Sequence, residues 1–108
     1  MKNIGDLMDL MKNARHFQER LQALQEEMAR KTVTADAGAG AVSATVNGRL
    51  ELVKLSIDKT RVDAADTEML EDLIVSAVHQ AQEKAAGMMK DEMGRAASEM
   101  GIPPGMLP

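Results

Sequence analysis

The sequence predicts an α+β protein with a long N-terminal helix, a three-stranded antiparallel sheet and a long C-terminal helix. Apolar residues recur every three or four positions in the first third of the chain, which is the spacing of an amphipathic helix. They alternate singly between Thr32 and Asp58, as strands require, and then return to the helical spacing. The 108 residues suffice for one domain, which we place at residues 1–101, followed by a flexible Pro-rich tail at residues 102–108.

The first helix is predicted at about residues 6–31. Its apolar side chains alternate between spacings of three and four residues, so they form one stripe along the helix. The stripe consists of Leu7, Leu10, Ala14, Phe17, Leu21, Leu24 and Met28. The other residues of this segment are mostly good helix formers, and no proline interrupts them. A stripe this narrow needs a second helix to cover it.

Three strands are predicted next, joined by short turns. The first alternates over residues 32–35 and the second over residues 42–46. The Asn47-Gly48 pair predicts a two-residue type I′ hairpin, because both residues tolerate the positive φ angles of that turn. The third strand is expected at residues 49–58.

The apolar pattern of the third strand changes phase. Leu50 and Leu52 point to one face, whereas Val53, Leu55 and Ile57 point to the other. Two explanations remain open: a β-bulge lies at this point, or both faces of the strand are covered.

The second helix is predicted at residues 67–100. Asp66 is suited to cap its N-terminus, and several acids follow where the helix dipole favours negative charge. The first half of this helix carries large apolar residues. The second half carries mainly Ala and Met, and Gly87 and Gly94 weaken it further. The tail at residues 102–108 is expected to be extended and mobile.

Charge is distributed unevenly along the chain. The formal net charge is −4, and the stretch from Asp58 to Asp72 alone holds six acids against two bases, so the rest of the chain is neutral overall. Within the first helix, the segment from Lys12 to Arg20 holds three bases against one acid, Glu19. A protein with an acidic total can therefore present a basic face on its first helix.

The composition argues against several classes of function. The chain has no cysteine, and its two histidines lie far apart in the sequence, so we expect no metal site and no cofactor. No Ser-His-Asp set, carboxylate pair or cofactor loop indicates an enzyme or a small-molecule substrate. No apolar run reaches the roughly 18 residues of a membrane span, and the N-terminus carries charges where a signal peptide would be apolar. We therefore expect a cytoplasmic protein that is not an enzyme and does not contact a membrane.

The lengths of the predicted elements indicate a homodimer. Helices of this length span about 37 to 50 Å, whereas the strands span about 20 to 33 Å. The helices must overhang the sheet, and their apolar stripes stay exposed unless a second copy covers them. We assign seven residues to this dimer seam: Leu7, Leu10, Phe17, Leu21, Leu24, Leu73 and Ile74.

Four segments of the chain resemble the YbaB/EbfC family of bacterial nucleoid-associated proteins. They are GAGAVSATVNG, the strand end SID, DTEMLEDLIVSAVHQA and the C-terminal GIPPGM, and they occur in the family's order and spacing. The resemblance covers nearly the whole chain. It implies a tweezer-shaped homodimer that binds double-stranded DNA in the nucleoid, organises the chromosome and affects gene expression.

The resemblance supplies no basic motif, so the DNA-contacting residues are chosen from this sequence. Lys12 and Arg15 come first, because they share a helix face away from the apolar stripe. The second choices are Arg20, Arg30, Lys31, Lys84, Lys90 and Arg95. Phosphates need only point charges, and no base-reading motif is present, so we expect little sequence specificity. For each base, the competing interpretation is an ordinary solvated helix face.

A second function remains open at this stage. The acidic residues 58–72 and the Met-rich helices also suit a protein-interaction module, such as an accessory to recombination or replication proteins with only weak DNA contact. DNA binding by the isolated protein separates the two hypotheses.

Overall fold

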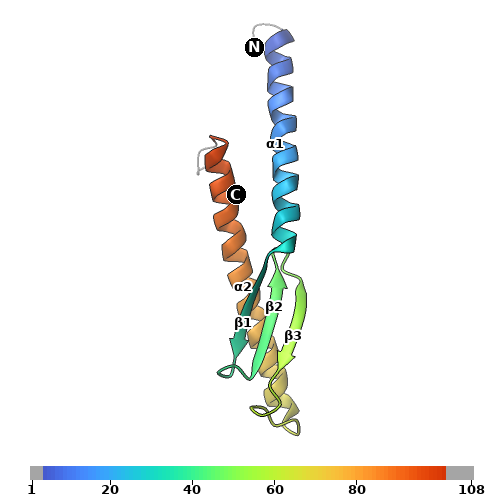
Figure 1. The fold of residues 1–108 in the computed structure, drawn as a ribbon, viewed down its shortest axis with the longest axis vertical. Coiled ribbons are helices and arrows are strands. Elements are labelled where there is room, and N and C mark those ends of the chain that lie inside the picture. The colour runs from blue at the N-terminus through green and yellow to red at the C-terminus, as the bar shows by residue number, and fades with distance from the viewer. Residues whose placement is uncertain (1–3, 102–108) are drawn as a thin grey trace.

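The fold consists of two long helices and a three-stranded sheet. The computed structural model describes residues 4–101. In chain order the elements are α1 (Ile4–Arg30), β1 (Thr32–Ala37), β2 (Val42–Asn47), β3 (Leu52–Ile57) and α2 (Thr67–Glu99). The strands are antiparallel in the order β1-β2-β3, so the predicted α+β class is confirmed (Figure 1). The predicted tail lies outside the described residues.

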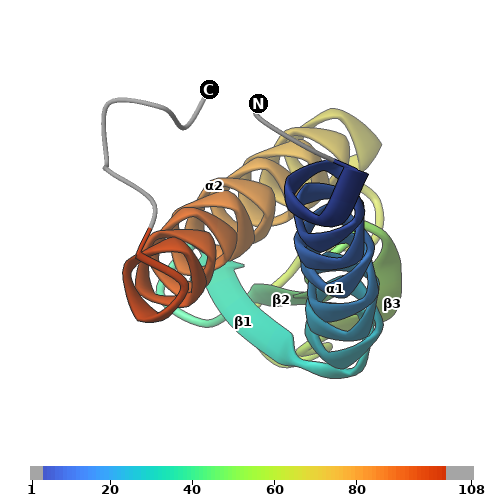
Figure 2. The same cartoon turned by 90° about the horizontal axis from the view of Figure 1, so that it is seen from above.

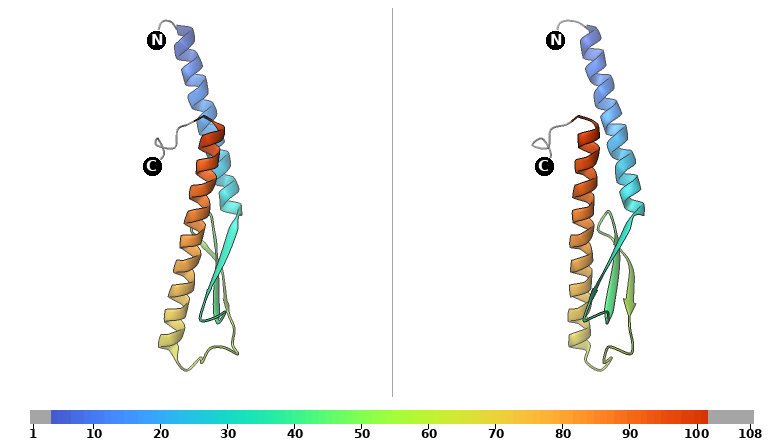
Figure 3. Two further views of the ribbon diagram at one scale, coloured as in Figure 1. Left: turned by 90° about the vertical axis from the view of Figure 1, so that its left-hand side faces the viewer. Right: turned by 60° about the vertical axis from the view of Figure 1, so that its left-hand side comes forward.

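The main core lies between the sheet and the first half of α2. Figure 3 shows α2 running along one face of the sheet. Val42, Ala44 and Val46 of β2 meet Ala77 and Ala81 of α2, and all five side chains are fully buried. The small alanine side chains, one helical turn apart, allow the helix to approach the strands closely.

The β2–β3 connection differs from the predicted type I′ turn. Neither Asn47 nor Gly48 has a positive φ angle; the left-handed residue is Leu50, at φ 66°. The Leu50 N–H donates to the Asn47 carbonyl at 3.0 Å. The Asn47 side-chain oxygen accepts from the backbone N–H groups of Arg49 at 2.9 Å and Glu51 at 3.1 Å. The connection is therefore a four-residue loop, residues 48–51, organised by an asparagine side chain, and β3 begins later than predicted.

Glycine is required at position 48 because the backbone of Met28 lies too close to allow a side chain, and not because the φ angle is positive. Its N–H donates to the Met28 carbonyl at 3.0 Å, beside the Lys31 N–H, which donates to the same oxygen at 3.1 Å at the C-terminal end of α1. A Cβ atom on Gly48 would lie 2.3 Å from that same oxygen. The hairpin loop and the end of α1 are thereby fixed to each other.

The phase change in β3 is a β-bulge, which confirms the first of the two explanations. Thr45 pairs with Lys54 and Val46 pairs with Leu52, so Val53 is the extra residue. Every residue of β3 is exposed in the single subunit. The strand therefore forms an apolar sheet edge that this subunit leaves uncovered.

Aspartates organise the loop that leads into α2. Asp66 caps the helix as predicted, accepting from the Met69 N–H at 3.1 Å. The Asp58 carboxylate accepts from the Thr60 hydroxyl at 2.6 Å and from the Thr60 N–H at 3.0 Å, and it pairs with Arg61 at 3.3 Å. These hydrogen bonds from Thr60, together with the charge of Arg61, lower the pKa of Asp58 from its ordinary value.

α1 is an arm attached near its C-terminal end. Leu24 and Met28 pack against Met89 and Met93 of α2, whereas residues 4–20 are exposed all round. The molecule measures 73 × 22 × 19 Å, and α1 extends beyond the end of α2 (Figure 1). Seen from above, α1 stands over the β2–β3 side of the sheet, with α2 beside it (Figure 2).

Candidate nucleic-acid interface

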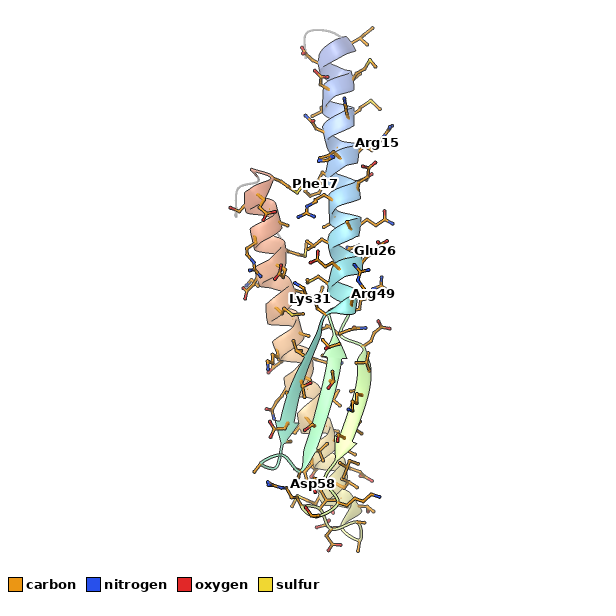
Figure 4. The ribbon with its side chains drawn as sticks, viewed as in Figure 1. Arg15, Phe17, Glu26, Lys31, Arg49 and Asp58 are labelled. Carbon is orange, nitrogen blue, oxygen red and sulfur yellow. The ribbon has the colours of Figure 1, made fainter. Side chains whose placement is uncertain are left out.

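Three bases form an outer face on α1. Lys12 and Arg15 are about one turn apart, and Arg30 follows Lys12 by about five full turns, so all three project in similar directions. Each is exposed, and within the described part of the chain none forms an ion pair. Figure 4 shows Arg15 on the side of α1 opposite α2. Lys12 and Arg15 also line a shallow hollow with His16 and Glu19.

Three other predicted bases are paired with acids near the contact between the two helices. Arg20 of α1 lies 3.5 Å from the carboxylate of Glu99 of α2. Lys31 lies 3.5 Å from the Glu92 carboxylate, and Arg95 donates a hydrogen bond to the same carboxylate oxygen. These five residues are termed the inter-helix cluster. Their cations are already neutralised within the subunit.

Lys84 and Lys90 belong to neither group. The Lys84 ammonium donates to the Thr34 carbonyl at 3.1 Å, so it satisfies an acceptor on the free edge of the sheet at β1. Lys90 is exposed, and among residues 4–101 it has no ion-pair partner. Of the two, only Lys90 is available to an external anion without breaking an internal bond.

Arg49 is an exposed base that sequence reasoning placed only in a strand. It lies in the β2–β3 loop beside the C-terminal end of α1 (Figure 4). Its position directly after the Asn-Gly pair could have indicated its exposure, since loop residues commonly project into solvent. Arg49 stands at an apolar cavity of about 190 Å³ between the helices and the loop. The cavity is also lined by Leu21, Leu24, Gln25, Met28, Gly48, Met89 and Met93.

The predicted dimer-seam residues occupy two environments. Four of them are buried or half-buried inside the subunit: Leu21, Leu24, Leu73 and Ile74. The other three are exposed on the arm, Leu7 at 43%, Leu10 at 57% and Phe17 at 37%. Figure 4 shows Phe17 on the side of α1 that faces α2. A second subunit could therefore cover only these three without unpacking the first.

Residues 4–101 hold no group of three or more His, Asp or Glu side chains arranged to bind a metal ion. Neither of the two helices that the structure describes is long and apolar enough to cross a membrane.

The fold and this interface define a class of protein: a small elongated α+β subunit that presents unpaired bases on a projecting helix, as nucleic-acid-binding proteins do. The family model described as the YbaB/EbfC DNA-binding family matches residues 1–100. The chain therefore belongs to this family, and the resemblance seen in the sequence is confirmed.

Individual relatives agree with this assignment. A nucleoid-associated protein of Pelotomaculum thermopropionicum is 40% identical over 99 residues, which cover 92% of this chain and 94% of the relative. A nucleoid-associated protein of Xanthomonas euvesicatoria is 44% identical over 102 residues, covering 94% of each chain. The crystal structure of an uncharacterized protein from Helicobacter pylori matches with a TM-score of 0.58 at 28% identity, covering 79% of this chain and 92% of the other.

Proposed function

We propose that this protein binds double-stranded DNA with little sequence specificity as a homodimer. In this role it associates with the nucleoid, organises the chromosome and affects gene expression. The observation that carries the proposal is the outer face of α1, whose three bases have no ion pair in the described residues and project from an arm that the sheet does not block. Membership of a DNA-binding family supports it independently.

The chemistry of the outer face favours phosphate over base edges. Lys12, Arg15 and Arg30 are long, flexible cations, which suit a line of phosphates and carry no sequence information themselves. The one aromatic side chain, Phe17, faces the subunit's own α2, so the outer face offers no stacking platform for bases (Figure 4). Binding by this face should therefore depend on salt more than on sequence.

The homodimer is proposed from the exposed apolar surface around β3. Leu52, Val53, Leu55 and Ile57 are between 37% and 53% exposed, and Val75 of α2 is 68% exposed. An edge strand with a row of exposed apolar side chains is a template for pairing with another chain. A twofold axis through this surface would place two arms on one particle and double every base on the outer face.

A gel shift with two unrelated duplexes at low salt tests the proposal. We expect the wild type to shift both duplexes and the double variant Lys12→Glu/Arg15→Glu to shift neither, because each arm loses two positive charges and gains two negative ones. Lys12→Glu alone should weaken both shifts, whereas its matched control Lys59→Glu, which makes the same charge change at an exposed lysine in the loop before α2, should not.

Two outcomes would contradict the proposal. Unchanged binding by an intact dimer of the double variant would remove α1 from the interface. A wild type that shifts no duplex even at low salt would refute DNA binding and favour the protein-interaction function.

A further inference from the structure

Glu92 differs from the other acids of α2 in the number of bases that it pairs with. One of its carboxylate oxygens serves both Lys31, from the end of α1, and Arg95, one turn further along α2. Two of the eight bases expected to contact DNA are therefore held by one acid. Within the described residues, no other carboxylate pairs with two bases.

The burial of these side chains places the acid inside and the cations outside. The Glu92 side chain is 22% exposed, whereas the side chains of Lys31 and Arg95 are 40% and 68% exposed. A phosphate arriving from solvent would meet the two cations first, with the carboxylate behind them. The cations could then exchange the carboxylate for the phosphate without the helices moving apart.

We propose that Glu92 sets the affinity of the arms for DNA by competing with phosphate for Lys31 and Arg95. The proposal rests on the proposed function. In the free protein the carboxylate neutralises both cations, so each phosphate contact there requires an internal ion pair to be exchanged. Such an exchange gains less than a contact made by an unpaired base, because the internal pair is lost and the displaced carboxylate repels the phosphate.

The remaining ion pair of the inter-helix cluster is expected to affect DNA affinity less. Arg20 and Glu99 are both well exposed, with side-chain exposures of 46% and 66%, so water screens their attraction. Lys31 also lies 3.9 Å from Glu27, which can hold it in part when Glu92 is removed. Removing the charge of Glu92 should therefore change DNA affinity mainly by freeing Arg95.

Glu92→Gln tests the proposal, with Glu68→Gln as the control. Both variants replace an acid on α2 with an amide and change the net charge equally, but Glu68 lies in the first turn, far along the helix from Arg95. Measured by fluorescence anisotropy at low salt, Glu92→Gln should bind duplex DNA about fivefold more tightly than the wild type. Its plot of log affinity against log salt should be steeper by about one to two units, since freed bases add phosphate contacts.

A double-mutant cycle separates competition from simple repulsion of phosphate by Glu92. In the wild-type background Arg95→Gln should lower the affinity by less than about twofold, because Arg95 is already neutralised. In the Glu92→Gln background the same change should lower it by about fivefold. A gain from Glu92→Gln that is the same with and without Arg95 would overturn the proposal.

These outcomes are distinct from failure of the proposed function. If the wild type binds DNA and Glu92→Gln behaves like Glu68→Gln, only the role of Glu92 is refuted. If the wild type and both variants bind no DNA, the function itself fails. Gln forms helices about as well as Glu, so the variants should fold, and circular dichroism checks that they do. Glu99→Gln, which frees the exposed Arg20, should tighten binding by a smaller factor than Glu92→Gln, and the reverse order would contradict the argument from burial.

Discussion

At the scale of single residues, Gly48 makes the sharpest prediction. A methyl group there would meet the backbone of Met28, which cannot rotate away as a side chain can. We expect Gly48→Ala to lower the free energy of unfolding by about 1–3 kcal/mol, as overpacking does. Thermal and urea unfolding followed by circular dichroism would measure the change.

Gly87 provides the matched control. It lies inside α2, and a Cβ atom there would meet nothing within 4 Å. Gly87→Ala should therefore raise the free energy of unfolding by about 1 kcal/mol through helix propensity alone. Equal effects of the two substitutions would show that the contact between Gly48 and Met28 is not maintained in solution.

Asp58 gives a prediction about pH. The hydrogen bonds from Thr60 lower the pKa of Asp58 in the folded protein. The carboxylate therefore contributes to stability above its unfolded pKa, and this contribution is lost as the pH falls through the lower, folded value.

Thr60→Val removes the hydroxyl donor and leaves the backbone donor in place. We expect the pKa of Asp58, followed by NMR titration of its carboxyl group, to rise part of the way toward the ordinary value. The stability difference between wild type and variant should disappear at a pH below the folded pKa of Asp58. A difference that persists there would mean that Thr60 stabilises the loop without acting on the charge.

The residue scale is also where the sequence was least informative. The Asn-Gly pair correctly indicated a hairpin but not its type, because the turn depends on the tertiary contact of Gly48 with α1 as well as on the local hydrogen bonds of the Asn47 side chain. Similarly, the charge of Lys31 and Arg95 was visible in the sequence. Their shared partner Glu92 was not, because it faces Lys31 only once α1 and α2 lie side by side.

At the scale of elements, the periodicity predicted almost everything. Both helices, the three strands and the Asp66 cap lie within a few residues of their expected places, because each depends on local spacing and local hydrogen bonds. The bulge in β3 was visible as a phase change. What the periodicity did not predict is that a single apolar stripe on α1 divides, with its C-terminal part packed on α2 and its N-terminal part open.

The attachment of α1 can be tested through Met28, which is 2% exposed. We expect Met28→Ala to weaken the contact between α1 and α2 by about 2–5 kcal/mol, as core truncations do. Hydrogen exchange should then speed up in the last turns of α1 but not in the strands. Met11→Ala is the control: its residue is 60% exposed, and the change should alter stability by no more than about 0.5 kcal/mol. Unchanged exchange in Met28→Ala would mean that the methionine cluster does not hold the arm.

At the scale of the whole molecule, the elongated shape explains why apolar surface such as the open sheet edge stays uncovered. A radius of gyration of 20.5 Å is well above the roughly 13 Å expected of a compact domain of this length, so much apolar surface is left at the rim. The sequence predicted this overhang from element lengths. All seven predicted seam residues lie on the helices, whereas the exposed side chains of β3 offer a second surface that alternation alone could not identify as uncovered.

Leu55→Glu tests the role of β3 in pairing. Leu55 is 38% exposed in the subunit, and a carboxylate buried there between two subunits would be unpaired. We expect sedimentation velocity to report a dimer for the wild type and a folded or partly folded monomer for this variant at micromolar concentration. Met69→Glu, at an exposed position in the first turn of α2, should leave the dimer intact. A dimer unaffected by Leu55→Glu would move the interface to the exposed seam residues of α1.

The salt dependence of DNA affinity tests the central claim most directly, namely that the unpaired bases of two arms hold the phosphate backbone. Fluorescence anisotropy with two unrelated duplexes should give nearly equal affinities for both. With three outer bases on each of two subunits, about six phosphates are contacted, so log affinity should fall against log salt with a slope of about −5 for either duplex. A slope near zero, or a preference of more than about a hundredfold for one duplex, would contradict the account, because binding would then depend on contacts to base edges.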